Sequence, residues 1–251
     1  AQRYTPGHMA ASEPEEVYPL RHRLRVGEHR EIAPAVYYLR LESGPAFGPG
    51  QSVSVGLEPD GPARYYSVAS GTEESGIAIL YDLVEGGALT PRLSRCEVGD
   101  TLWVSEAFGS FTDDADAEAV WIATGTGVAP FLSMARSFDS GRLGSRKRLI
   151  HGGRSLERFY FARELAGLLG TSYLRCCSRC EPQAGPEAIP ANAPLYPGRL
   201  TRWLEERIGA GELDTGSRYM LCGSSAMVVQ VRDLLIRGGV PFAQIHAEIY
   251  F

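Results

Sequence analysis

The sequence predicts two domains of different classes, an N-terminal antiparallel six-stranded β-barrel followed by a parallel, doubly wound α/β sheet. Up to about Phe111, short apolar strands alternate with turns, and no long helical segment separates them. Beyond that point, apolar strands alternate with amphipathic helical segments, which is the pattern of a parallel sheet. The change falls in the acidic segment Thr112–Glu118. We therefore expect one domain over residues 9–115 and a second over residues 116–251.

Length and composition agree with this division. The chain has 251 residues, of which 44% are hydrophobic and 22% are charged, so it holds enough apolar material for two cores. A formal net charge of -5 argues against a nucleic-acid partner. We find neither an apolar run long enough to cross a bilayer nor a signal-peptide pattern, and so expect a cytoplasmic protein with no membrane partner. Gly7-His8-Met9 resembles a cloning junction before a native Met9, so we expect residues 1–8 to be no part of the fold.

The cysteines and the lysine exclude some kinds of chemistry. Five cysteines without a secretory context are expected to be reduced thiols. Cys177 and Cys180 have the spacing of metal ligands, but no second pair exists and Arg179 lies between them, so we expect no metal site. Lys147 is the only lysine, which makes lysine-based covalent catalysis a poor hypothesis.

Six strands are predicted in the first domain. In Arg21–Val26, three arginines alternate with His22, Leu24 and Val26, as in a half-buried strand, and the arginines form either a solvated edge or a patch for an acidic partner. A turn over Phe47–Gln51 precedes the third strand. The remaining predicted strands are Val36–Leu41, Ser52–Leu57, Ala63–Ser70, Ile77–Val84 and Thr101–Ser105.

The fourth strand carries the most informative residues of this domain. Side chains alternate along a strand, so Arg64 and Tyr66 share one face while Tyr65 and Ser67 share the other. One face can thus offer a guanidinium to phosphate oxygens and a ring for stacking, and the following turn can bring in the Ser67 hydroxyl. This pattern favours a flavin dinucleotide site, although a core tyrosine beside a surface arginine would leave the same pattern.

A glycine-rich turn follows the fifth strand. Gly86 and Gly87 allow close approach of a ligand to the backbone, and Thr90-Pro91 begins a short helix whose free N–H groups point outward. A phosphate fits such a turn. Together with Arg64, the turn would supply partners for both halves of a diphosphate.

The second domain is predicted as alternating strands and helices. The expected strands are Ala119–Ala123, Arg148–His151, Tyr173–Cys177 and Tyr219–Cys222. The expected helices are one from Pro130 to about Phe138, Ser155–Leu169, Leu200–Ile208, and a last one that Ser224 caps and Gly238-Gly239 ends.

Two groups of residues at the carboxyl ends of these strands fit a second dinucleotide. Gly125-Thr126-Gly127 follows the first strand and begins a helix, so a pyrophosphate would lie on its exposed amides. Guanidinium groups with a nearby hydroxyl suit the 2′-phosphate of NADP rather than NAD. The residues of this kind that should share one rim of the sheet are Arg154, Ser178, Arg179 and Arg199. The alternative is that they are ordinary surface residues that bind no ligand.

The last strand and the C-terminus complete the candidate residues. Cys222-Gly223 could border a nicotinamide ring, although a buried cysteine is most often only a small apolar residue. The terminal segment Ala247–Phe251 is strand-like and contains two aromatic residues, one of which could cover a flavin face or pack in the core.

Taken in order, these motifs resemble the ferredoxin–NADP reductase family, and most closely its bacterial ferredoxin/flavodoxin–NADP reductases. The resemblance extends from about Val17 to Phe251. The motifs that carry it are Arg64-x-Tyr66-Ser67, Gly86-Gly87-x-x-Thr90, Gly125-Thr126-Gly127-x-Ala129-Pro130, Cys222-Gly223 and Glu248-x-Tyr250, with Phe47-x-Pro49-Gly50-Gln51 in the barrel. Glu106–Gly109 departs from the family pattern, because many relatives have Gly-Pro before this Phe-Gly.

The resemblance implies a role for each candidate residue. Arg64 would hold the FAD pyrophosphate, Tyr66 would stack on the isoalloxazine, and Ser67 would lie near flavin N5. The rest of the implied FAD site is Tyr65, Leu83, Val84, Gly86, Gly87, Ala88, Leu89 and Thr90, with Phe251 beside the adenine. The implied NADP site is Gly125 to Pro130 (including Thr126, Gly127 and Ala129), Arg154, Ser178, Arg179, Arg199, Cys222 and Gly223.

The resemblance also implies an activity. Hydride would pass between NADPH C4 and flavin N5 beside Ser67, Cys222 and Glu248, and Tyr250 would occupy the nicotinamide position until displaced. Single electrons would pass to a separate ferredoxin or flavodoxin. Two alternatives stay open: a reductase that serves an oxygenase or reduces free flavin, and a non-enzymatic flavin-binding sensor subunit.

Overall fold

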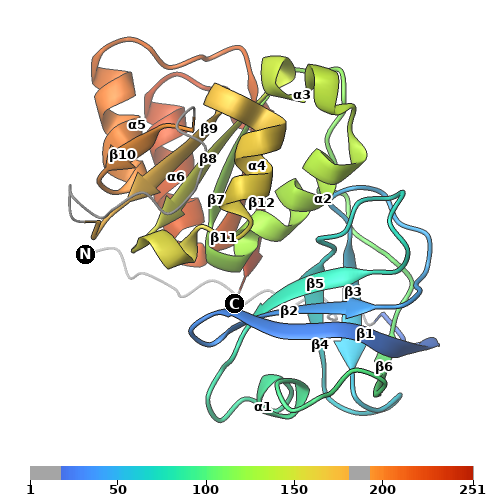
Figure 1. Ribbon diagram of the computed structural model, residues 1–251. Coiled ribbons are helices and arrows are strands. Elements are labelled where there is room, and N and C mark those ends of the chain that lie inside the picture. The colour runs from blue at the N-terminus through green and yellow to red at the C-terminus, as the bar shows by residue number, and fades with distance from the viewer. Residues whose placement is uncertain (1–17, 181–192, 251) are drawn as a thin grey trace, which may run out of the picture.

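A computed structural model describes residues 18–180 and 193–250, which form two sheets of different kinds (Figure 1). The first sheet is antiparallel and six-stranded, with strand order β4-β3-β6-β1-β2-β5. Its strands are β1 (His22–Ala33), β2 (Val36–Leu41), β3 (Ser52–Gly56), β4 (Ala63–Ser67), β5 (Ala78–Asp82) and β6 (Thr101–Val104). A short helix, α1 (Thr90–Leu93), lies where the sequence predicts it.

The two edge strands of this sheet meet. An antiparallel bridge joins Val68, just after β4, to Ile79 in β5, and the Ala69 amide donates to the Ala78 carbonyl at 2.7 Å. The sheet therefore curls on itself around fully buried side chains such as Val26 and Val53. The predicted six-stranded antiparallel barrel is confirmed.

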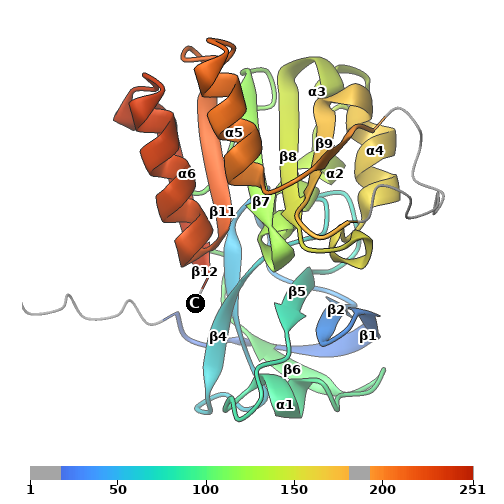
Figure 2. The same ribbon diagram turned by 90° about the vertical axis from the view of Figure 1, so that its left-hand side faces the viewer.

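The second sheet is six-stranded and parallel, with order β10-β9-β8-β7-β11-β12. Helices cover both of its faces (Figure 2). The strands are β7 (Ala119–Thr124), β8 (Lys147–Gly153), β9 (Tyr173–Cys177), β10 (Leu195–Pro197), β11 (Arg218–Ser224) and β12 (Ile245–Tyr250). One face carries α2 (Ala129–Ser137), α3 (Ser140–Arg146) and α4 (Ala162–Leu169), and the other carries α5 (Leu200–Gly209) and α6 (Ser225–Arg237). The predicted doubly wound sheet is confirmed.

One predicted helix is wrong in its first half. Instead of a continuous helix over Ser155–Leu169, a short 3₁₀ turn at Leu156–Arg158 is followed by α4, and Phe161 between them has φ +56. The Phe161 ring packs 5.5 Å from the Tyr38 ring and 5.1 Å from the Arg136 guanidinium. Contacts with the barrel and with α2 thus hold this residue in a left-handed conformation that separates the 3₁₀ turn from α4, which begins at the next residue.

The expectation of five reduced thiols is wrong for one pair. Cys177 and Cys180 form a disulfide across the turn that follows β9, where their Cα atoms are 5.5 Å apart. The turn folds back tightly enough to bring them to an ordinary disulfide separation. Cys96, Cys176 and Cys222 lie outside any disulfide.

A buried ion pair fixes the segment between the sheets. Lys147 Nζ lies 2.8 Å from Asp113 Oδ2, and both side chains are 0% exposed. The same ammonium donates to the carbonyls of Asp114 and Ala117 at 2.6 and 2.7 Å, while Trp121 Nε1 donates to Asp113 Oδ2 at 2.8 Å. All three ammonium donors are therefore used, and the only lysine of the chain holds the connecting segment against β7 and β8.

Helix α2 joins the second domain to the barrel. Ser133 Oγ donates to the Ser70 carbonyl at 2.8 Å, and Arg136 Nη1 donates to the Ala69 carbonyl at 3.0 Å. Arg136 is in turn held by the Glu164 carboxylate at 2.7 Å. These hydrogen bonds hold the backbone of Ala69 and Ser70, just after β4, and so fix the position of the end of that strand relative to the parallel sheet.

Within the described part of the chain, no helix has the length and apolar character needed to span a membrane. The same residues contain no group of three or more His, Cys, Asp or Glu side chains arranged to hold a metal ion.

Candidate active site

A carboxylate from the second domain meets two hydroxyls from the barrel. Ser67 Oγ donates to Glu248 Oε2 at 2.9 Å, and Ser52 Oγ donates to Glu248 Oε1 at 3.3 Å. Ser52 and Ser67 are paired in the register of β3 and β4, which places both hydroxyls on one side of that hairpin. Figures 1 and 2 show β12 directed toward the barrel at this junction. The candidate site therefore lies between the domains.

Burial changes the acidity of this carboxyl group. Desolvation raises the pKa of Glu248, and the hydrogen bonds from Ser67 and Ser52 oppose that rise without cancelling it. Glu248 therefore holds a proton more readily than a surface glutamate. A buried carboxyl group with a shifted pKa between two domains is typical of a functional site.

The parallel register explains why Cys222 and Glu248 belong to one site. Cys222 on β11 pairs with Glu248 on β12 and with Ala123 on β7, and it is fully buried. Gly223 follows with φ +149, and a Cβ there would lie 2.4 Å from Thr124 Oγ1. The structure thus places Glu248 against Ser67 and beside Cys222, the three residues that the family resemblance puts at one site.

The Gly125-Thr126-Gly127 motif lies at the point where the sheet order reverses. From β7 the chain proceeds to β8, β9 and β10 on one side, whereas β11 and β12 lie on the other. A 3₁₀ turn, η1 (Gly125–Val128), leads from β7 into α2, which has Pro130 in its first turn. Thr126 Oγ1 donates to Asp82 Oδ2 of the barrel at 2.9 Å. Ligands of open α/β sheets bind at such reversal points.

Gly127 is required by packing. A Cβ at this position would lie 2.4 Å from the Cys222 carbonyl oxygen and 2.7 Å from Gly223 Cα, both of which are backbone atoms. We expect Gly127→Ala to push η1 away from β11 and to lower the free energy of unfolding by about 1–3 kcal/mol. Urea denaturation measures this loss.

A second glycine provides the matched control. Gly167 lies in α4, and a Cβ there meets nothing within 4 Å. Gly167→Ala should raise stability by about 0.5–1 kcal/mol, because alanine favours the helix. Equal losses in both variants would show that the contact with Cys222 does not matter.

On the barrel side, Arg64 presents a guanidinium without an ion-pair partner and Tyr66 a hydroxyl without a hydrogen-bond partner among the described residues. The exposed Arg64 guanidinium donates to the Ala63 carbonyl at 2.7 Å, and among the described residues no carboxylate lies within ion-pair distance of it. The Tyr66 hydroxyl is buried and has no hydrogen-bond partner among those residues, and burial raises its pKa. Tyr66 packs against the barrel core, whereas Tyr65 is 44% exposed.

The glycine-rich turn lies on the same side of the barrel as Arg64. Because β4 and β5 run antiparallel through the Val68–Ile79 bridge, Arg64 lies on the same side of that bridge as Leu83. Gly86 has φ +74 in open space, and Ala88 is exposed.

Two residues of this turn, Leu89 and Thr90, are buried and stabilise the barrel instead of forming an open surface. Thr90 Oγ1 accepts from the Val84 amide at 2.9 Å, and Leu89 is 2% exposed. Of the residues predicted to bind phosphate here, Gly86 and Gly87 are thus more accessible than Thr90.

The predicted phosphate rim is brought together by the sheet order. Arg154, Ser178 and Arg199 follow the neighbouring strands β8, β9 and β10, and with Arg179 they are exposed. Among the described residues, no carboxylate pairs with the guanidinium groups of Arg154, Arg179 or Arg199. The rim lies on the opposite side of β7 from Glu248, so a ligand that bridges both would cross η1.

Sequence reasoning missed Ser52 and Asp82, which contact Glu248 and Thr126. Ser52 could have been found from the pairing of β3 with β4, because it lies opposite Ser67. Nothing in the sequence points to Asp82. Tyr250 ends β12, where its backbone pairs with Ser224, and Phe251 lies outside the described residues.

Comparisons with known proteins agree with this geometry. A family model described as an oxidoreductase NAD-binding domain matches residues 121–233. Ferredoxin--NADP reductase B of Sorangium cellulosum (strain So ce56) is 34% identical over 240 residues, which cover 88% of this chain and 94% of that protein.

Two further comparisons extend the picture. The ferredoxin--NAD(P)(+) reductase component of the naphthalene 1,2-dioxygenase/salicylate 5-hydroxylase systems of Ralstonia sp is 25% identical over 217 residues, covering 85% of this chain and 63% of that protein. A solved ferredoxin NADP+ reductase from Neisseria gonorrhoeae with bound FAD and NADP has a TM-score of 0.76 at 21% identity, covering 92% of this chain and 98% of that one. Its likeness shows that both domains are arranged as in that fold.

Proposed function

Because the chain belongs to the ferredoxin–NADP reductase family and is therefore an oxidoreductase, we propose that it transfers hydride between NADPH and bound FAD and exchanges single electrons with a separate ferredoxin or flavodoxin. The observation that carries the proposal is the contact between Ser67 of the barrel and Glu248 of the parallel sheet, 2.9 Å long, on the edge strand β12, two strand positions from β7, where the sheet order reverses. Two dinucleotides that approach from the two domains would meet there.

The barrel residues fit FAD. The Arg64 guanidinium is exposed and without a carboxylate partner in the described chain, as a pyrophosphate ligand should be. The Tyr66 hydroxyl is a buried polar atom that lacks a partner among the same residues, so a polar ligand group beside it would remove a desolvation cost. The open turn at Gly86 and Gly87 lets a ligand approach the backbone.

The second domain fits NADP(H). The η1 turn follows β7 and offers backbone amides for the pyrophosphate, and Gly127 keeps this turn close to β11. The exposed guanidiniums of Arg154, Arg179 and Arg199, with the Ser178 hydroxyl, suit the doubly charged 2′-phosphate.

In this mechanism the protein orients the two rings. When bound, FAD supplies the redox chemistry by accepting a hydride and releasing electrons singly. The rim residues bind the distant 2′-phosphate, and this binding energy keeps the nicotinamide in place. Ser67 and Glu248 form a hydrogen-bonded pair, so the carboxylate fixes the direction of the Ser67 hydroxyl beside the transfer point. We propose that Tyr250 covers the nicotinamide position until NADPH displaces it.

The preference for NADPH over NADH tests whether the rim residues bind the 2′-phosphate. We expect Arg179→Ala to raise the KM for NADPH by about 10- to 100-fold, because hydrogen bonds to charged groups contribute about 1.5–3 kcal/mol. The KM for NADH should stay unchanged, since NADH has no 2′-phosphate. Steady-state oxidation of both nucleotides gives the two values.

An arginine at the opposite edge of the sheet provides the control. Arg142 lies in α3, which leads into the amino end of β8, and it pairs with Asp116 at 2.9 Å. Arg142→Ala should leave both KM values unchanged. A parallel rise for NADPH and NADH in Arg179→Ala would contradict the assignment of the 2′-phosphate to this rim.

The visible spectrum of the purified protein tests the whole proposal. A flavin absorbance that NADPH bleaches far more readily than NADH, under anaerobic conditions, is the expected result. A folded, colourless protein that does not take up added FAD would refute the proposed function.

A second candidate function changes only the electron acceptor. The likeness to the Ralstonia reductase component favours a role as the reductase of an oxygenase system. Stopped-flow reoxidation of the reduced protein by ferredoxin, by flavodoxin and by free FMN separates the candidates. Fast reoxidation by free FMN alone would favour a free-flavin reductase.

A further inference from the structure

The Cys177–Cys180 disulfide encloses two residues of the proposed 2′-phosphate rim. Cys177 is the last residue of β9, is 1% exposed and belongs to the core of the second domain. Cys180 is partly buried and packs against the same core. Ser178 and Arg179 lie between them and are exposed. We call residues 177–180 the disulfide turn. Both of its ends are thus tied to the core, while its two middle residues face solvent.

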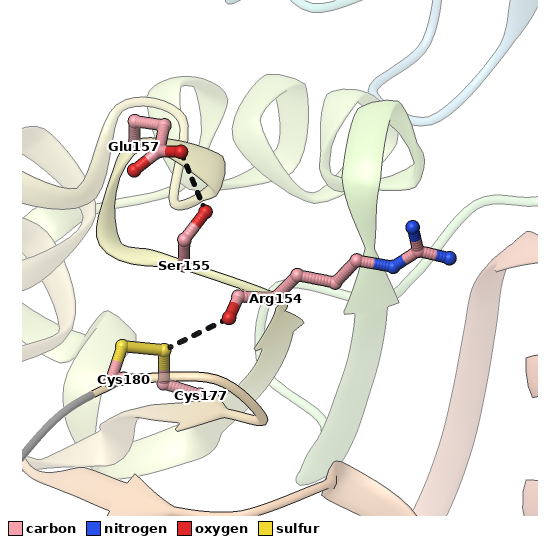
Figure 3. Close-up of a disulfide and its surroundings, with 5 residues drawn as sticks. All are labelled: Arg154, Ser155, Glu157, Cys177 and Cys180. Carbon is pink, nitrogen blue, oxygen red and sulfur yellow. Dashed lines mark hydrogen bonds between the residues drawn. A yellow bond between two sulfur atoms is a disulfide. The ribbon is translucent and has the colours of Figure 1, made fainter.

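The disulfide turn is also tied to the neighbouring strand. The Ser178 amide donates to the Gly153 carbonyl at 3.0 Å, and the Arg179 amide donates to the Arg154 carbonyl at 2.9 Å. Figure 3 shows the disulfide beside the Arg154 backbone, with Cys177 Sγ 3.6 Å from the Arg154 carbonyl oxygen, while the Arg154 side chain extends away from the sulfur atoms. The turn and Arg154 are therefore held as one unit, with the Arg154 guanidinium left available.

A direct part in hydride transfer does not fit this position. Cys177 lies on β9, and Glu248 lies on β12, four strand positions away in the sheet. At about 4.8 Å between neighbouring strands, this places them roughly 19 Å apart. The disulfide is thus too far from Ser67 and Glu248 to exchange electrons by contact, and it can influence the site only through the shape of the turn.

We propose that the Cys177–Cys180 disulfide positions Ser178 and Arg179 for the 2′-phosphate, so that reduction of this bond weakens recognition of NADPH but not of NADH. The inference rests on the proposed function, because it needs the rim to bind NADPH. With the bond closed, Arg179 is held by a short covalent ring and by the hydrogen bond that its amide donates to the Arg154 carbonyl. With the bond open, the Cys180 end is tied only by noncovalent packing, and ordering the turn around a phosphate costs conformational entropy.

The chemistry of the switch is a two-electron exchange with a dithiol reductant. A thiolate of the dithiol attacks Cys180 Sγ, which is the more accessible sulfur, and forms a mixed disulfide while Cys177 leaves as a thiolate. The second thiol of the reductant then displaces Cys180 and becomes oxidised to a disulfide. Both cysteines end as thiols, with the two protons that the dithiol gave up. The Cys177 thiol can donate to the Arg154 carbonyl oxygen, 3.6 Å away.

The experiment compares the FAD-loaded protein with and without the bond. Dithiothreitol-treated wild-type protein and Cys180→Ser are each expected to show a KM for NADPH about five- to tenfold higher than the oxidised wild type. The KM for NADH and the kcat with either nucleotide should not change. Binding of 2′,5′-ADP, measured by calorimetry, should weaken by the same factor, while binding of 5′-AMP should stay constant. Cys180 is suited to substitution because it is only partly buried, whereas Cys177 is 1% exposed.

Two controls make the result decisive. Cys96→Ser removes a thiol of the barrel, far from the rim, and should respond to dithiothreitol as the wild type does. Cys180→Ser should show no response to dithiothreitol. The inference is overturned if the oxidised wild type prefers NADPH and keeps that preference after reduction, or if thiol titration of the air-equilibrated protein finds Cys177 and Cys180 reduced. A protein that oxidises no NADPH in either state refutes the proposed function instead.

Discussion

Replacement of Ser67 with alanine is expected to slow hydride transfer from NADPH by about 100-fold while leaving FAD bound, because one positioned hydroxyl at a transfer point contributes about this much. Ser67 Oγ is 2.9 Å from Glu248 Oε2, and the Ser67 side chain is buried. Removing the hydroxyl leaves Glu248 with the longer bond from Ser52. Anaerobic stopped-flow bleaching of the flavin in a single turnover measures the rate.

Ser52 provides the matched comparison for this variant. It bonds the same carboxylate at 3.3 Å from the neighbouring strand, and is also buried. Ser52→Ala keeps the Ser67–Glu248 bond, so we expect a rate close to that of the wild type, within about threefold. An unchanged single-turnover rate in Ser67→Ala would remove Ser67 from the mechanism. Equal slowing in both variants would instead assign the effect to the placement of Glu248.

The two-domain fold could be predicted because each half repeats a single pattern. Alternating polar and apolar residues such as those of Arg21–Val26 favour antiparallel strands, and the fully apolar Ala119–Ala123 favours a strand covered on both faces. The rim could be predicted for the same reason, since residues that follow parallel strands collect at one edge. The contact between Ser67 and Glu248 could not be predicted from a local pattern, because the two residues lie far apart in the sequence. Only the family resemblance placed them at one site.

Other features depend on tertiary contacts that no local pattern carries. The helix break at Phe161 follows from packing against Tyr38 and Arg136, which lie in a barrel strand and in another helix. The disulfide was missed because the argument from the expected compartment outweighed the spacing of Cys177 and Cys180. Spacing alone allows a metal site, a disulfide or two free thiols, and the path of the turn after β9 decides among them.

The buried pair of Lys147 and Asp113 should be the most sensitive point for stability. We expect Lys147→Met to lower the free energy of unfolding by about 3–5 kcal/mol, because it leaves the Asp113 carboxylate buried without its main partner. The carbonyls of Asp114 and Ala117 lose their donor as well. Urea denaturation followed by tryptophan fluorescence reports the loss, since Trp121 contacts the same carboxylate.

Two further variants separate the buried charge from the loss of side-chain packing. Arg142→Met breaks the nearby pair with Asp116, whose side chains are 59% and 72% exposed, and should cost less than about 1 kcal/mol. The double variant Lys147→Met with Asp113→Asn removes both buried charges and keeps an oxygen acceptor for Trp121. It should be more stable than Lys147→Met alone, because the penalty comes from a buried carboxylate left with only the more distant Arg218 guanidinium, 3.7 Å away, and not from the missing ammonium itself. A double variant as unstable as the sum of both single variants would show that Lys147 acts through packing and its carbonyl bonds.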